Sequence, residues 1–180
     1  MDFKNICNIN SLQLEDWKAG ERYQGQSADI AGEMGAKKMG FHVEILPPGM
    51  FSCPYHFHRL EEEWFFVIAG KAMLRQHNRY RELTPGDILH FGCSEEYAHQ
   101  FYNHTDAEFK FIALSTIDEN DIAEYPDSNK IYFRKQKKMF LQASVIPYLT
   151  GEENPEDGWD RSMLTSVPGL CSRDEREGRE

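Results

Sequence analysis

Two histidines one residue apart are the first feature of the sequence that could do chemistry. His56 and His58 flank Phe57 in a short run typical of a β-strand. Because side chains alternate between the two faces of a strand, both imidazoles should point the same way. Two nitrogen donors on one face supply half of a metal site. Other segments must provide the remaining ligands.

Candidate ligands follow along the chain. Three consecutive glutamates at positions 61–63 precede a strand-like run at 64–68, which could bring a carboxylate back beside the imidazoles. Alternation does not choose among the three, since both faces of that run are apolar. His99 begins a later strand-like run and would meet the others across an interior. A lone histidine is often a core residue and a glutamate run is often a solvated turn, but the combination favours a metal centre.

The segments that position these residues read as consecutive short strands. From Phe41 onward apolar and polar residues alternate until Pro47, Pro48 and Gly49 stop the pattern. Further strand-like runs follow at 55–58, 64–68, 71–76, 80–83, 87–91, 99–102 and 109–116. Residues that permit chain reversal separate the runs, and no long helix intervenes. This spacing predicts an all-β sandwich or barrel.

The flanking segments differ from the strand-rich middle. We expect an N-terminal arm at 1–40, a β-barrel core at 41–117 and a C-terminal extension at 118–172 that packs on the barrel. Apolar runs near 131–133 and 140–148 could add an edge strand or cover the barrel. The last residues, 173–180, are almost all charged, and we expect a disordered tail there.

Composition limits the partners and the compartment. The 180 residues suit one domain with extensions, and the net charge of -10 argues against a nucleic-acid partner. No apolar run is long enough to span a bilayer, and the opening residues lack a signal-peptide pattern. The four cysteines form no Cys-x-x-Cys pair, which favours reduced thiols. We therefore expect a cytoplasmic protein with no membrane partner, in which Cys53 and Cys93 are buried thiols.

Two sequence motifs resemble those of the cupin family. The first cupin motif, a Gly, a His-x-His, four residues, a Glu, six residues and a Gly, is matched by Gly49, His56, His58, Glu63 and Gly70. The second motif is matched by Gly86, His99 and Asn103. The chain is thus similar to small single-domain bacterial cupins of the cupin-2 type, a group whose activities are mostly undefined. The resemblance implies a cupin double-stranded β-helix, also called a jelly-roll barrel, and the metal ligands His56, His58, Glu63 and His99.

The second motif departs from the family pattern. Its loop at 93–98 is longer than usual, which leaves the register before His99 open. His90 and His104 are therefore alternatives to His99 as the fourth ligand. The intact spacing from His99 to Asn103 favours His99.

Residues near the ligands are candidates for a substrate pocket. Alternation from Glu63 and from His99 turns aromatic and apolar side chains toward the metal, and a few polar residues lie on or near the same strands. The pocket candidates are Phe65, Val67, Arg75, His90, Gln100 and Phe101. Plain barrel core is the simpler interpretation of the apolar members.

The expected ligand set points to one divalent ion. Nitrogen and oxygen donors are compatible with Mn, Fe, Ni, Zn or Co, and such an ion can act as a Lewis acid. We expect a protein that acts on a small oxygenated substrate, a sugar or an organic acid, as an isomerase, epimerase or lyase. A metal-dependent dioxygenase and a non-catalytic small-molecule-binding or metal-stabilised module stay open as alternatives. Exposed barrel edges and the apolar arm favour a homodimer.

Overall fold

The structure is a computed structural model that describes residues 5–77, 79–142, 147–148, 150–151 and 154–155. The chain divides into two compact units, residues 1–143 and 144–180. In the second unit the described residues include a turn in which the Thr150 amide donates to the Pro147 carbonyl at 3.1 Å. The expected tail at 173–180 and most of 143–172 lie outside the described residues. The following account concerns the first unit.

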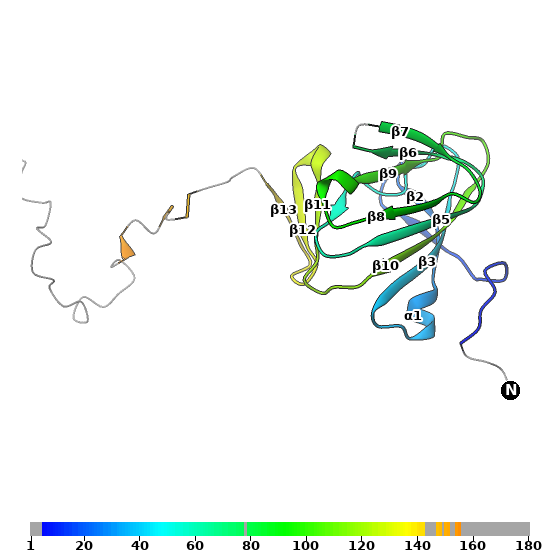
Figure 1. Cartoon of the computed structure of the whole chain (residues 1–180), viewed down its shortest axis with the longest axis horizontal. Helices are drawn as coiled ribbons and strands as arrows, with labels where there is room; N and C mark the ends of the chain where they lie inside the picture. The colour runs from blue at the N-terminus through cyan, green and yellow to red at the C-terminus, as the bar shows by residue number, and fades with distance from the viewer. Residues whose placement is uncertain (1–4, 78, 143–146, 149, 152–153, 156–180) are drawn as a thin grey trace, which may run out of the picture. The chain divides into compact units, whose positions relative to one another are not determined.

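Strands dominate the first unit, as the sequence predicted, and they form three sheets (Figure 1). The six-stranded sheet has the order β1 (Glu15–Lys18), β2 (Gln24–Asp29), β3 (Met39–Leu46), β10 (Phe109–Thr116), β5 (Glu63–Ala69) and β8 (Ile88–Phe91). The three-stranded sheet has the order β7 (Arg79–Leu83), β6 (Ala72–Gln76) and β9 (His99–Tyr102). The four-stranded sheet has the order β13 (Lys138–Leu141), β12 (Lys130–Phe133), β11 (Ile122–Tyr125) and β4 (Phe57–His58). Short helices α1 (Ile30–Met34), η1 (Glu95–Tyr97) and η2 (Pro126–Ser128) connect strands.

The core lies between the six-stranded and the three-stranded sheet. Alternation places Phe65 of β5, Phe101 of β9, and Phe109 and Phe111 of β10 on the same interior, where all four are buried. Their rings meet edge-to-face or tilted, with centroids 5.0–6.2 Å apart. At the β5–β6 turn, Gly70 has φ of 73°, and a Cβ there would lie 2.0 Å from the Glu108 carbonyl oxygen. This turn between the two sheets therefore requires glycine.

The segment expected as an N-terminal arm contributes two strands to the main sheet. Strand β2 pairs antiparallel with β3, with Ser27 opposite Glu44, and β1 pairs with β2. Helix α1 follows, and its N-terminus is capped by the Asp29 carboxylate, which accepts from the Gly32 amide at 2.8 Å. Residues 15–29 therefore help to build the wall of the barrel.

The segment that follows the barrel also pairs with it. Strand β11 runs antiparallel to β4, with Ala123 opposite His58 and Glu124 opposite Phe57. Strands β12 and β13 extend this sheet outward, at the end of the barrel visible beside β11 in Figure 1. The short strand that carries His58 is thus held by residues more than sixty positions later in the chain.

Candidate metal centre

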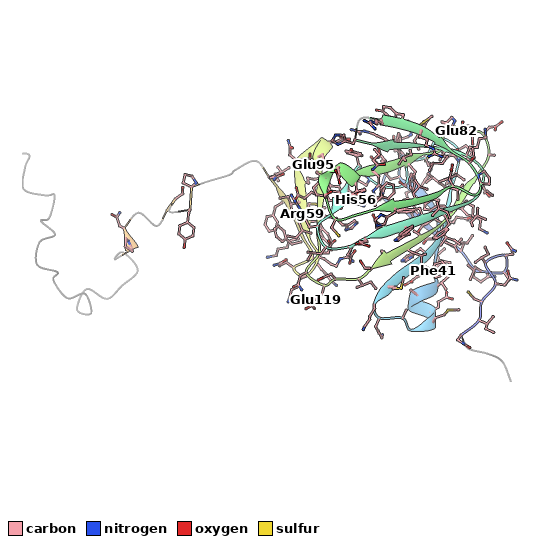
Figure 2. The ribbon with its side chains drawn as sticks, in the orientation of Figure 1. Phe41, His56, Arg59, Glu82, Glu95 and Glu119 are labelled. Atoms are coloured by element: carbon pink, nitrogen blue, oxygen red, sulfur yellow. The ribbon has the colours of Figure 1, made fainter. Side chains whose placement is uncertain are left out.

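Four side chains from separate segments meet at one end of the barrel, the end next to β11, where Figure 2 marks His56. His58 belongs to β4, while Glu63 begins β5 and His99 begins β9. His56 forms an isolated bridge with His99, in which the His99 amide donates to the His56 carbonyl at 2.9 Å. Backbone pairing therefore fixes the approach of these two histidines.

The ligand atoms lie close together. One donor atom from each of His56, His58 and Glu63 lies within 4.8 Å of the other two. Glu63 Oε2 is 3.8 Å from His58 Nε2 and 3.4 Å from His99 Nε2. Ligands placed about 2.1 Å from a common ion lie about 3–4 Å apart, so small side-chain shifts bring this set to coordination distance. The arrangement fits a divalent ion.

Hydrogen bonds orient two of the rings. His56 Nδ1 lies 3.0 Å from the Pro54 carbonyl oxygen, and His99 Nδ1 lies 3.1 Å from the Tyr97 carbonyl oxygen. A carbonyl only accepts, so both Nδ1 atoms carry the proton. The Nε2 atoms are left as the metal-facing nitrogens, which is the orientation that acceptors behind a histidine ligand impose.

A carboxylate orients the third ring. His58 Nδ1 donates to Asp121 Oδ2 at 2.6 Å, and Asp121 Oδ1 accepts from the Leu60 amide at 3.0 Å. Burial alone would raise the pKa of Asp121, but the hydrogen bond and the charge of His58 outweigh it and lower the pKa to about 2. Asp121 stands just before β11, and nothing in the local sequence pattern singles it out.

The three consecutive glutamates have different roles. Glu61 is buried and accepts from the Asp118 amide at 2.9 Å and from the Arg134 guanidinium. Glu62 is half exposed and lies 3.6 Å from His90. Of these three glutamates, Glu63 is the one whose carboxylate lies close to the Nε2 atoms of His58 and His99. His58, Glu61 and Asp121 form a second cluster of possible metal ligands. The Arg134 guanidinium pairs with both carboxylates of that cluster and offsets their negative charge.

Two histidines of the centre have opposite protonation tendencies. Burial, together with the charge of His56, holds the pKa of His99 well below its usual range, so His99 is neutral. Burial also acts to lower the pKa of His56, but Cys53 and Glu63 outweigh it and raise that pKa to about 9. Metal binding at His56 would therefore release a proton.

A cavity of about 480 Å³ adjoins the centre. Glu63 and His99 line it, and so do the pocket candidates Phe65 and Phe101. Cys53 also lines it and is half-buried, whereas Cys93 is exposed, so the expectation that both thiols are buried is wrong. Side chains from the N-terminal strands complete the wall: Trp17, Ser27, His42 and Glu44. Sequence reasoning missed these four, although the alternation of His42 and Glu44 along β3 had placed them on one face.

The remaining pocket candidates lie outside the cavity wall. Val67 belongs to the apolar core. Arg75 makes two hydrogen bonds to Asp127, of 2.6 and 2.8 Å, and its guanidinium lies 4.0 Å from the centre of the Tyr55 ring. The His90 ring packs on Trp64. The Gln100 side-chain amide donates to the Cys53 carbonyl at 2.6 Å. His104, an alternative ligand, pairs with Glu82 at 3.1 Å.

Comparison with known proteins agrees with the fold and the motifs. Residues 42–115 match the family model of the cupin domain. The proposed sugar phosphate isomerase of Acidithiobacillus ferrooxidans superposes with a TM-score of 0.74 at 24% identity, over 80% of this chain and 96% of that one. A cupin-superfamily sugar phosphate isomerase of Silicibacter pomeroyi gives 0.67 at 21% identity, over 78% and 96% of the two chains.

A third structure is more distant. The predicted oxalate decarboxylase of Thermotoga maritima gives a TM-score of 0.53 at 18% identity, over 63% of this chain and 99% of that one. No curated protein sequence matches the chain. Within the described residues, no helix is both long and apolar enough to cross a membrane. Residues 42–115 therefore match the cupin domain, and the structure around them has the cupin jelly-roll fold.

Proposed function

We propose that this cupin binds one divalent metal ion through His56, His58, Glu63 and His99 and acts on a small oxygenated substrate. One observation carries the proposal: hydrogen bonds on the Nδ1 atoms of three imidazoles leave their Nε2 atoms for a metal, and those of His58 and His99 lie 3.8 and 3.4 Å from Glu63 Oε2. Three neutral nitrogens and one carboxylate suit Mn, Fe, Ni, Zn or Co. Because only one ligand is anionic, a net positive charge remains to attract an oxygen donor.

The bound ion would supply Lewis-acid chemistry, which polarises a carbonyl or stabilises an enediolate. The chain's own residues shape the site around that chemistry. Phe65 and Phe101 form an apolar wall that excludes water, and Ser52 and Cys53 add polar atoms to the same cavity. A volume of about 480 Å³ accommodates a sugar or a small organic acid.

Polar side chains in the cavity favour an enzyme over a purely structural metal site. Proton transfer needs an ionisable group that reaches the substrate, and Glu44 and His42 line the same cavity as Glu63. Two of the similar structures are of proteins described as sugar phosphate isomerases. That association is one of fold, and it supports an isomerase only as an analogy.

Elemental analysis of protein purified without chelator tests the metal assignment. We expect the wild type to retain near-stoichiometric metal and the H56A and H58A variants to lose most of it. His104→Ala is the matched control, since His104 pairs with Glu82 on the surface, and it should retain the wild-type content. A wild type without metal, or a full content in both ligand variants, contradicts the proposal.

We also propose that the protein works in the cytoplasm. Cys7, Cys53 and Cys93 are free thiols, which suits a reducing compartment. Cell fractionation of the native host should recover the chain in the cytosolic fraction, and recovery in an oxidising compartment would contradict this.

A further inference from the structure

The cavity has a second polar wall, formed by Trp17, Ser27, His42 and Glu44. Strands β1, β2 and β3 supply these residues, so the wall comes from the part of the main sheet that lies beyond β10. Antiparallel pairing places Ser27 directly opposite Glu44. None of the four belongs to the candidate metal centre.

Glu44 is the centre of this wall, and its carboxylate is held in place. Ser27 Oγ donates to Glu44 Oε1 at 2.6 Å, and Trp17 Nε1 donates to Oε2 at 3.2 Å. Burial raises the pKa of Glu44, while these two hydrogen bonds oppose the rise. Each carboxylate oxygen has a second acceptor position, so Glu44 can accept further hydrogen bonds from a ligand.

The backbone is shaped to bring the Trp17 ring to this position. Trp17 pairs with Gly25 across β1 and β2. A Cβ at position 25 would lie 3.1 Å from the Trp17 ring and 2.6 Å from the Ile45 carbonyl oxygen. The absence of a side chain at Gly25 therefore lets the indole N–H reach Glu44.

The second wall stands apart from the metal centre. Glu44 pairs with Phe111 of β10, which on its other side pairs with Val67 of β5, four residues after Glu63. Two strand spacings across the sheet and four residues along β5 separate the backbones of Glu44 and Glu63 by roughly 16 Å. A ligand that contacts both the metal centre and Glu44 must therefore contain several carbon atoms.

The charge of the cavity selects the chemistry of that ligand. Among the described residues that line the cavity there is no lysine or arginine, and two carboxylates, Glu44 and Glu63, face it. Phosphate groups are bound by such cations or by clustered amide donors. A phosphate at the second wall would be repelled by the Glu44 carboxylate, beside which the His42 imidazole stands in place of a lysine or arginine, whereas a hydroxyl group can donate to Glu44.

From this wall we infer that the cavity binds an uncharged sugar or polyol through hydroxyl groups that donate to Glu44, and that it excludes the corresponding phosphate esters. The inference rests on the proposed function for the other end of the ligand, which the metal centre would hold. Two similar structures are named as sugar phosphate isomerases, whereas the ligand inferred here carries no phosphate.

Fluorescence of Trp17 reports on this wall directly. The sequence has three tryptophans, so the variant W64F/W159F leaves Trp17 as the single emitter. We would titrate it with D-glucose, D-fructose and D-ribose, each paired with its 6- or 5-phosphate, and measure the metal content of the same samples. Two further variants are compared in this background: Glu44→Gln, and the control Glu15→Gln, which alters an exposed carboxylate at the start of β1.

We expect at least one neutral sugar to change the emission saturably and its phosphate ester to bind at least tenfold more weakly. Glu44→Gln should weaken the neutral sugar at least tenfold, and Glu15→Gln should leave it within twofold. The inference is overturned by a phosphate ester that binds as tightly as its sugar, by an unchanged Glu44→Gln variant, or by no response to any neutral sugar. If the samples contain no metal, the proposed function is refuted, but the inference about the second wall is still tested. The wall contains no metal ligand, so its preference between a sugar and its phosphate ester is measured either way.

Discussion

At the candidate metal centre, each imidazole has an acceptor behind it that sets its direction. Backbone carbonyls serve His56 and His99, with Cys53 Sγ also 3.5 Å from His56 Nδ1, and the Asp121 carboxylate serves His58. Residue types and spacing indicated a metal site around His56 and His58, and the resemblance to the cupin motifs selected Glu63 and His99 as its other ligands. The role of Asp121 could not be predicted from the sequence, because Asp121 lies 63 positions from His58 and no local periodicity connects the two.

Removal of the charge behind His58 should weaken metal binding while the barrel stays folded. We expect Asp121→Asn to reduce metal affinity about 10–100-fold, the usual effect of losing such a supporting carboxylate. Titration with a metal-competing chelator measures the change. The control Glu119→Gln alters a carboxylate that is mostly exposed and should leave the affinity as in the wild type. An affinity for Asp121→Asn within twofold of wild type would show that Asp121 does not support the ligand.

At the scale of elements, the strands were predictable and their partners were only partly so. Alternation is a local property, so runs such as 64–68 and 109–116 correspond to β5 and β10. Sheet membership depends on distant pairings, such as β4 with β11 and β2 with β3, which a local pattern does not encode. The second polar wall of the cavity was missed for this reason, because Ser27 and Trp17 join the barrel only through the pairing of β2 with β3 and of β1 with β2.

The stability of the barrel should depend mainly on its aromatic core. Phe109 is fully buried against Phe101 and Phe111, so Phe109→Ala should cost about 3–5 kcal/mol of unfolding free energy. Phe140 on β13 is 49% exposed, and Phe140→Ala should cost less than about 1 kcal/mol. Urea denaturation followed by circular dichroism compares the two. Equal losses would mean that the core is not where the stability resides.

At the scale of the whole molecule, an exposed apolar face suggests how two chains could associate. Trp64 and Ile68 of β5 and Ile88 of β8 are 43%, 36% and 61% exposed on neighbouring strands of the main sheet. Patches of this kind often mark protein interfaces. We propose that this face joins two copies of the chain, whereas β1 and β2 pair within their own sheet.

Light scattering at micromolar concentration tests the homodimer. We expect twice the chain mass of 21.0 kDa for the wild type and the single-chain mass for Ile88→Lys, because a buried lysine would oppose the contact. Met139→Lys, at a similarly exposed apolar position on β13, should stay dimeric. A monomeric wild type, or a dimeric Ile88→Lys variant, would rule out this interface.

The most direct measurement of the central claim is a crystal structure of the chain purified without chelator, with anomalous data collected at the absorption edges of the candidate metals. Our account predicts a single anomalous peak bound by the Nε2 atoms of His56, His58 and His99 and by a carboxylate oxygen of Glu63. A peak elsewhere, or no peak at this end of the barrel, would contradict it.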